Sequence, residues 1–378
     1  MSESPHTLAA QLRERIERDG PITFRDWMEA ALYDPQGGYY QRADLTRWGR
    51  AGDYRTSAER SPLFAATFAQ YFAALDEELS APHPFTIIES GAGDGSFARS
   101  VLETLRRDHP ETFPRIHYLI DELSDDARQR IKHTLGEFVE QTAFVQLSDQ
   151  EEPIGEGLIF TNELLDALPV HRVTMRDGKL SEFYVGLNEM CEFVWVEREP
   201  STPRLIEHLL HHQINLEEGQ IVEINLAAAD WTARAEKLLQ RGFLITVDYG
   251  AEASELYHDP RRHTGTLRAF RRHQFAGNVL ASPGEQDLTT TIDWTQIRTA
   301  GEAAGLQTIL FEPQDQFLLR AGLLEQLELL TASAADEAER VNLRLAAREL
   351  ILPGGMSGSF QVLVQEKFSV FSKTKSQN

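Results

Sequence analysis

The residues best suited to chemistry lie in one glycine-rich stretch, residues 89–95, which reads Glu-Ser-Gly-Ala-Gly-Asp-Gly. The stretch follows the apolar run Phe85–Ile88 and precedes a predicted helix from Phe97 to about Asp108. Glycines let a backbone turn sharply and approach a ligand without a Cβ in the way. A strand, a glycine loop and a helix in this order form the usual nucleotide site of an α/β sheet, at the carboxyl ends of its strands. The stretch therefore predicts a site for a nucleotide-derived cofactor.

The glycine spacing separates two kinds of cofactor. Dinucleotide-binding loops use Gly-x-Gly-x-x-Gly, because the pyrophosphate sits on the N-terminus of the following helix. Here the spacing is Gly91-x-Gly93-x-Gly95, with Glu89 in front of it. An acidic neighbour repels a pyrophosphate, whereas Glu89 and Asp94 attract the cationic amino group and the sulfonium of S-adenosylmethionine. The loop favours S-adenosylmethionine over NAD, although a purely structural strand-to-helix turn would use similar glycines.

Carboxylates follow the next two predicted strands. The run Ile116–Ile120 ends in Asp121 and Glu122, where a carboxylate can accept hydrogen bonds from both ribose hydroxyls. We expect Glu122 to take this role, with Asp121 as a neighbour that could instead point into solvent. After the run Ala143–Leu147, Asp149 is a candidate for the adenine edge or, alternatively, a helix cap. These positions support the prediction of a nucleotide-derived cofactor.

The elements that must position these residues form an alternating pattern. Two further apolar runs, Gly157–Phe160 and Phe243–Val247, are separated by helical stretches, and extended runs recur at Leu306–Phe311 and Phe360–Val364. Apolar strands that alternate with helices indicate a largely parallel sheet covered on both faces. The predicted fold class is therefore α/β with a Rossmann-like sheet.

Two regions depart from this pattern. Residues 1–80 are mostly helical, with Leu8, Leu12 and Ile16 on one stripe, and contain a long aromatic loop of the kind that usually carries function. Between residues 170 and 196, extended runs flank Asp177-Gly178, which is a hairpin signal. We therefore expect a helical N-terminal region and an antiparallel hairpin insertion.

Composition limits the partners and the compartment. The 378 residues include 59 acidic and 37 basic side chains, for a net charge of −22, so we expect no nucleic acid and some attraction to basic protein segments. The single cysteine, Cys191, excludes internal disulfides and cysteine-based zinc clusters, and no metal is expected. Neither a membrane span nor a secretion signal is recognisable, which favours a soluble cytoplasmic protein.

Four other segments complete a pattern that resembles the MidA-like class I methyltransferases. They are the run from Gly20 to Tyr40, the run from Gly52 to Ser57, the run from Asn162 to His171, and the stretch from Asp248 to Thr289. The resemblance extends from about residue 20 to Lys367, and Asn-Glu-x-x-Asp-Ala-Leu-Pro, which begins at Asn162, is its most specific part. The family includes bacterial proteins and the mitochondrial arginine methyltransferase that helps to assemble respiratory complex I.

The resemblance implies a class I methyltransferase fold, S-adenosylmethionine as methyl donor, and an arginine of a partner protein, such as a complex I-like subunit, as acceptor. It also suggests a division of the chain. We expect N-terminal helices and lid loops over residues 1–80, a methyltransferase domain over residues 81–368 with insertions at 170–220 and 251–293, and a tail over 369–378. A homodimer is compatible with this organisation.

The acceptor is expected beside the segment that follows the fourth strand of the sheet. A guanidinium is planar and always charged, so carboxylates must orient one of its nitrogens toward the methyl carbon. Glu163 and Asp166 are three residues apart and would be neighbours on a helical turn, with Asn162 beside the cofactor. The alternative is that Asp166 only caps a helix. His273 could accept a proton or orient the acceptor, or lie on the surface.

Lid loops would exclude water from the transfer. Tyr39 and Tyr40, together with Asp53 and Thr56, are the candidates. The sequence departs from the family pattern after Asp287-Leu288-Thr289, where Thr291 replaces an expected histidine, and in the cofactor loop, where Ala92 and Asp94 replace a proline and a more neutral residue. Two other functions stay open: methylation of a small molecule, and an assembly chaperone that binds S-adenosylmethionine without catalysis. A nicotinamide dehydrogenase is disfavoured by the glycine spacing.

Overall fold

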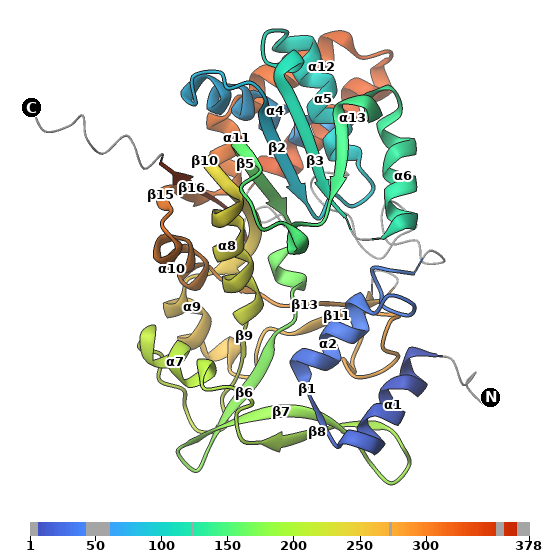
Figure 1. Cartoon of the computed structure of the whole chain (residues 1–378), viewed down its shortest axis with the longest axis vertical. Coiled ribbons are helices and arrows are strands. Elements are labelled where there is room, and N and C mark those ends of the chain that lie inside the picture. Colours follow the sequence, from blue (N-terminus) through green and yellow to red (C-terminus); the bar gives the residue numbers. More distant parts are fainter. Residues whose placement is uncertain (1–6, 43–60, 123, 272–273, 353–358, 369–378) are drawn as a thin grey trace, which may run out of the picture.

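Figure 1 shows the computed structural model, which describes residues 7–42, 61–122, 124–271, 274–352 and 359–368. Its centre is a sheet with the strand order β15-β16-β10-β5-β2-β3-β4, and the short strand β14 pairs with the end of β10. The bounds of these strands are β2 Phe85–Ser90, β3 Ile116–Asp121, β4 Thr142–Val145, β5 Gly155–Asn162, β10 Leu239–Ala251, β14 Ile292–Asp293, β15 Gln307–Pro313 and β16 Phe360–Lys367.

The pairing of these strands confirms the predicted largely parallel sheet. β4, β3, β2, β5 and β10 run parallel to one another. Only β16 is antiparallel to its two neighbours, β10 and β15. All six residues of β2 are buried, as expected of a central strand with both faces covered.

Helices cover both faces of this sheet. Alternate residues of β2 face opposite sides, so Ile87 joins a core with α4, α5 and α11–α13, while Ile88 packs on the side of α8. The bounds of the covering helices are α4 Pro62–Glu78, α5 Ser96–Asp108, α6 Asp125–Leu135, α8 Leu226–Leu238, α10 Trp294–Ala304, α11 Gln314–Arg320, α12 Leu323–Ser333 and α13 Glu337–Ile351. The domain boundary expected at residue 80 lies between α4 and β2. It therefore divides α4 from the large sheet, although α4 helps to form the core of that sheet.

A second lobe lies below the large sheet in Figure 1. Its five-stranded sheet is antiparallel and contains the predicted insertion, with bounds β1 Ile22–Thr23, β6 His171–Arg176, β7 Lys179–Leu187, β8 Phe193–Arg198 and β9 Ile221–Ile224. A three-stranded sheet of β11 Arg268–Arg271, β12 Gln274–Phe275 and β13 Asp287–Thr289 adjoins it. The remaining helices are α1 Leu8–Asp19, α2 Phe24–Tyr33, α7 Arg204–His211 and α9 Ala253–His258.

Three distant parts of the chain build the core of this lobe. Leu8, Leu12 and Ile16 form the predicted buried stripe of α1 and pack with residues of α2. The same cluster takes in Val185 from β7 and Leu288 from β13. The N-terminal helices are therefore part of the second lobe and do not form a separate region. No helix in the described ranges combines the length and the hydropathy that crossing a bilayer requires.

Candidate functional site

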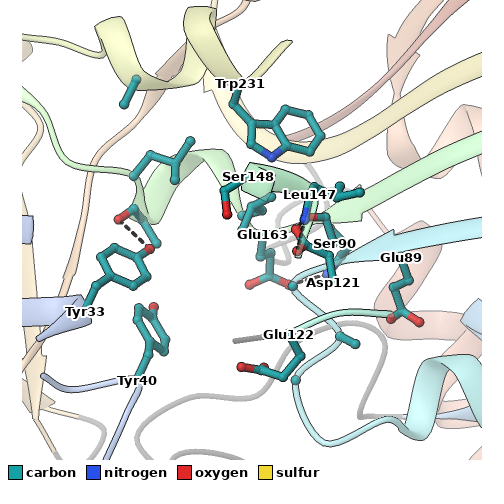
Figure 2. Close-up of a pocket in the computed structure, with 18 of the residues that line it drawn as sticks. Tyr33, Tyr40, Glu89, Ser90, Asp121, Glu122, Leu147, Ser148, Glu163 and Trp231 are labelled. Atoms are coloured by element: carbon teal, nitrogen blue, oxygen red, sulfur yellow. Dashed lines mark hydrogen bonds between the residues drawn. The ribbon is translucent and has the colours of Figure 1, made fainter. Parts of the chain in front are cut away.

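A cavity of about 540 Å³ lies at the carboxyl ends of β2, β3 and β5, between the large sheet and α2. Figure 2 shows Glu89, Asp121 and Glu122 on one side of it and Tyr33 and Tyr40 on the other, with the Glu163 side chain between them. The cavity thus has a half next to the glycine loop and a half next to α2. We call these the loop half and the α2 half.

The glycine loop forms the rim of the loop half. Gly91, Gly93 and Gly95 have φ angles of 81°, 58° and 83°, a left-handed conformation that other residues adopt only with strain. A Cβ at Gly91 would lie 3.3 Å from Cδ1 of Leu164, and one at Gly95 would lie 2.9 Å from Cγ2 of Ile131. The glycines therefore allow the turn, and they let it pack closely against the segment that follows β5 at Gly91 and against α6 at Gly95.

Glu89 is a buried acid within the cavity wall, with 4% of its surface exposed. The hydroxyl of Tyr118 donates a hydrogen bond of 2.6 Å to its Oε2. Burial raises the pKa of Glu89 to about 7; the Tyr118 hydrogen bond opposes this rise, and the nearby charge of Asp94 adds to it. In its ionised form, a buried carboxylate favours a cationic ligand group beside it.

Both acids after β3 reach the cavity. Asp121 accepts hydrogen bonds from Oγ of Ser90 at 2.5 Å and from the N–H of Leu147 at 3.0 Å, and burial raises its pKa. It therefore does not point into solvent, which was the expected alternative. Glu122 also lines the cavity and accepts a hydrogen bond of 2.7 Å from the N–H of Ser124. Both carboxylates therefore line the loop half, and the ribose contact expected of Glu122 stays a prediction.

The wall beyond these acids differs from the prediction. Asp149 is exposed and lies outside the cavity lining, whereas Leu147 and Ser148 belong to it. Arg234 of α8 secures this loop, since its Nε donates to the carbonyl of Leu147 at 2.8 Å. With Trp231 on the same helix, the wall is apolar and suits the face of an aromatic base.

These features fit S-adenosylmethionine. The loop offers backbone space, Glu89 offers a buried counter-charge for an amino group, and the acids after β3 offer hydrogen-bond acceptors for a ribose. Asn162, at the end of β5, lines the same cavity, and its buried Oδ1 has no hydrogen-bond partner among the described residues. A ligand N–H group in the cavity would satisfy it.

The α2 half is lined by one face of a helix. Arg25, Glu29 and Tyr33 are spaced four residues apart on α2 and all line the cavity. The Tyr33 hydroxyl donates to the carbonyl of Ala167 at 3.1 Å, and its ring stacks on that of Tyr40. None of these α2 residues was predicted from the sequence, although their helical spacing would have placed them on a common face.

The two expected lid tyrosines differ in position. Tyr40 lines the cavity, and its hydroxyl donates to Oδ1 of Asp287 at 2.8 Å. Tyr39 is fully buried in the core of the second lobe and lies outside the lining. Only Tyr40 of this pair can therefore contact a ligand. Three other candidates, Asp53, Thr56 and His273, lie outside the described residues.

The two expected acceptor acids are separated. Glu163 lines the cavity with φ at 53°, so no helical turn begins at this residue. Asp166 is 6% exposed, lies outside the lining, and accepts a hydrogen bond of 2.5 Å from the Tyr249 hydroxyl. This corrects the expectation that the two acids share one face of a turn. It also excludes Asp166 as a helix cap, because the turn after Glu163 is the short 3₁₀ segment Leu165–Ala167, which Asp166 itself occupies.

Thr291, the position at which the family pattern would have a histidine, contacts Arg268 rather than the cavity. Its hydroxyl accepts a hydrogen bond of 3.4 Å from Arg268, and its N–H donates to Oγ1 of Thr266. It is not among the lining residues. Within the described ranges, no group of three or more His, Cys, Asp or Glu side chains is arranged to hold a metal ion.

The chain is similar to known methyltransferases over almost its whole length. It is 28% identical to the mitochondrial protein arginine methyltransferase NDUFAF7 homolog of Drosophila melanogaster, covering 96% of this chain and 85% of that protein. It is 24% identical to the mitochondrial protein arginine methyltransferase NDUFAF7 of Homo sapiens, covering 95% and 83%. These relatives confirm the resemblance drawn from the sequence.

A solved structure extends the similarity to the fold and the cofactor. The protein from Burkholderia thailandensis, bound to S-adenosyl-homocysteine, superposes with a TM-score of 0.85 at 30% identity, covering 95% of this chain and 92% of that one. The class I fold and S-adenosylmethionine as cofactor are thereby confirmed. Residues 63–312 match the family described as S-adenosyl-L-methionine-dependent methyltransferases. The chain belongs to this methyltransferase family.

Proposed function

We propose that this methyltransferase modifies an arginine of a partner protein, and that Glu163 orients the acceptor guanidinium. The relatives named above are protein arginine methyltransferases, which supports the acceptor class. The observation that carries the role of Glu163 is its place in the cavity, between the loop half and the α2 half. A methyl group must pass between donor and acceptor at this boundary.

The charge of the cavity supports a cationic acceptor. Among the described lining residues, six are acidic and two are basic: Glu29, Glu89, Asp94, Asp121, Glu122 and Glu163 against Arg25 and Arg234. Arg234 is held by backbone carbonyls, and Arg25 donates to Glu29 at 2.6 Å. The remaining negative charge attracts a guanidinium and repels an anionic acceptor.

Methyl transfer requires that the protein align the reacting atoms and exclude water from them. S-adenosylmethionine, when bound, supplies an activated methyl group for direct displacement at carbon. The Glu163 carboxylate can accept two N–H bonds from a planar guanidinium and so fix which nitrogen faces the methyl group. Tyr33 and Tyr40 line the α2 half with aromatic rings, which limits the water that reaches the reacting atoms.

A small-molecule acceptor is the second candidate. The cavity volume of about 540 Å³ lies within the roughly 300–1,000 Å³ typical of small-ligand sites. A cationic metabolite with an amine or guanidine group would meet the same acidic lining. An assembly chaperone, the third possibility, would bind S-adenosylmethionine without transferring its methyl group.

The test is a transfer assay with radiolabelled S-adenosylmethionine. Extracts from cells lacking the gene serve as substrate, and labelled proteins are digested and searched for methylarginine. We expect label in protein, at arginine. Glu163→Gln should lower kcat/KM by about 10- to 100-fold, the loss expected for a hydrogen bond of ~1.5–3 kcal/mol to a charged group. Asp149→Asn, an exposed acid outside the lining, is the matched control and should leave kcat/KM unchanged.

Other outcomes overturn the proposal in different ways. Label confined to small molecules supports the second candidate. Binding of S-adenosylmethionine with no transfer to any fraction supports the chaperone. Normal activity of Glu163→Gln removes Glu163 from the proposed role but leaves the arginine acceptor standing. Cytoplasmic location and a homodimer stay predictions of the sequence.

A further inference from the structure

The residue proposed to meet the acceptor, Glu163, has an unusual backbone conformation. Its φ is 53°, in the left-handed region, where a residue with a long side chain is rare and strained. Such conformations persist only where the surrounding structure imposes them. Hydrogen bonds from several distant parts of the chain hold the turn from Glu163 to Leu168 in this conformation.

Asp248 supplies the side chain that holds this turn. Its Oδ2 accepts hydrogen bonds from the N–H groups of Leu165 at 3.1 Å and Asp166 at 3.3 Å. Its Oδ1 accepts one from the N–H of Tyr249 at 2.8 Å. The side chain is fully buried in the large sheet, at the carboxyl end of β10. An aspartate thus binds the turn 82 or 83 residues away in sequence, from the adjacent parallel strand.

Three other contacts leave the turn little freedom. The N–H of Glu163 donates to the carbonyl of Val247 at 3.0 Å. The side-chain amide of Asn225 donates to the carbonyl of Leu165 at 2.9 Å. The N–H of Thr290, just after β13, donates to the carbonyl of Asp166 at 3.0 Å. Asp248 binds the turn most extensively, because its carboxyl group accepts from three backbone N–H groups, those of Leu165, Asp166 and Tyr249.

Asp248 lies outside the cavity lining, so it does not touch a ligand. We propose that Asp248 is a positioning residue of the acceptor site: its carboxylate holds the turn after β5 and thereby directs the Glu163 side chain into the cavity. This rests on the proposed role of Glu163 toward an arginine acceptor. The sequence had predicted Asp166 as a second direct ligand of the acceptor. In the present proposal the second acid is instead Asp248 on β10, which acts only through Glu163.

A buried carboxylate at this place is also costly. Burial raises the pKa of Asp248 well above its ordinary value, and the neighbouring acids Asp166 and Glu163 raise it further, while the backbone N–H groups oppose the rise. An apolar residue would avoid that cost but could not bind the turn. The presence of a buried acid at position 248 is therefore better explained by its hold on the turn at the acceptor site than by a contribution to the stability of the sheet.

The experiment compares Asp248→Asn with Glu163→Gln, alone and combined, using the full chain and the methylated protein or an arginine peptide derived from it. We expect Asp248→Asn to lower kcat/KM for the peptide on the order of a hundredfold, the effect of displacing a reacting group by ~1 Å. The dissociation constant of S-adenosylhomocysteine should stay unchanged. In the Glu163→Gln background, Asp248→Asn should cause no further loss, because the two residues act through one contact.

A matched control separates positioning from general destabilisation. Asp293 is also a buried acid, 4% exposed, and caps α10 by accepting from the N–H of Gln296 at 3.1 Å. Asp293→Asn likewise removes a buried carboxyl group, and it should leave kcat/KM unchanged because asparagine caps a helix as well as aspartate does. If Asp248→Asn does not fold, Asn225→Ser takes its place. Serine keeps the capping preference at the start of α8 but removes the amide bond to Leu165, so the same pattern is expected.

Two results would overturn the inference. The first is a loss in the double variant equal to the product of the two single losses, since independent effects multiply. The second is a parallel loss of S-adenosylhomocysteine binding in Asp248→Asn, which would indicate collapse of the whole site. If Glu163→Gln itself has no effect, the proposed role of Glu163 fails instead. That outcome is distinguishable from failure at Asp248.

Discussion

Replacing Glu89 with glutamine tests whether the buried acid of the glycine loop is the charge that holds the cofactor. Glutamine has the same shape and can still accept the hydrogen bond from Tyr118, so the change removes little but the charge. A hydrogen bond to a charged group contributes about 1.5–3 kcal/mol, which corresponds to roughly a 10- to 100-fold rise in the dissociation constant. The measurement is calorimetric titration with S-adenosylhomocysteine at pH 7.5.

The pH dependence makes the test sharper. With the pKa of Glu89 raised to about 7, its carboxyl group is largely protonated below that pH. The cationic amino group of the ligand prefers the ionised form. We therefore expect affinity to rise between pH 5.5 and 7, by up to about tenfold per pH unit well below the pKa. In Glu89→Gln this slope should disappear, and the two proteins should differ least at pH 5.5.

The same acid has the opposite effect on the stability of the ligand-free protein. Its pKa is about 4.5 in the unfolded chain and about 7 in the folded one, so the folded state binds the extra proton between these values. Stability therefore falls as pH rises through this window, by up to about 3 kcal/mol, and stays at the lower value above pH 7. At pH 8 and without ligand, Glu89→Gln should melt at a higher temperature than the wild type.

Either of two results with Glu89→Gln would refute the reasoning. If Glu89→Gln keeps the wild-type pH slope of binding, another group titrates, and Asp121→Asn is the next variant to examine because burial also raises the pKa of Asp121. If the variant binds normally at pH 7.5, the acid of the glycine loop does not meet the cationic group. Asp149→Asn serves as the control, since this exposed acid should affect neither binding nor its slope.

Three further predictions concern the cavity and the fold. Gly91→Val places a branched side chain at a φ of 81° and against Leu164. Cofactor binding should therefore become undetectable by calorimetry, while the far-ultraviolet circular dichroism spectrum is retained. Normal binding would contradict the role of this glycine. Tyr33→Phe removes a hydrogen bond to a backbone carbonyl and should raise the KM of the acceptor by about 2- to 10-fold, with cofactor binding unchanged as the check. Asp76→Ala removes the fully buried carboxylate that Arg115 contacts through two nitrogens. In urea titrations, this change should lower the free energy of unfolding by about 3–5 kcal/mol. A loss below about 1 kcal/mol would show the pair to be dispensable.

Local patterns in the sequence predicted the elements well. The stripe of Leu8, Leu12 and Ile16 forms the buried face of α1, because apolar residues at helical spacing need a common surface. The apolar run that begins at Phe85 forms β2, with the glycine loop at its carboxyl end. Both results depend on residues close together in the sequence. The fold class and the cofactor follow from such local order.

The residues that meet the acceptor were predicted less well, because contacts between distant segments determine their positions. A spacing of three placed Glu163 and Asp166 together only if the turn were helical, and the left-handed conformation of Glu163 prevents this. The cause lies at Asp248, whose carboxylate binds the turn from the neighbouring strand. Likewise, Tyr39 and Tyr40 look equivalent in the sequence, but only the tertiary packing sends one into the core and the other into the cavity.

The three-part core of the second lobe has a consequence for synthesis of the chain on the ribosome. The apolar stripe of α1 emerges before its partner Leu288, which is made roughly 270 residues later. At ~5–20 residues per second, this leaves the stripe without its final partners for roughly 10–50 s. Nascent chains released or paused before residue 288 would expose an amphipathic helix that chaperones and proteases can recognise. The wall of the α2 half is therefore completed only after residue 288 has been made, and a chain that stops before this residue lacks part of its acceptor side.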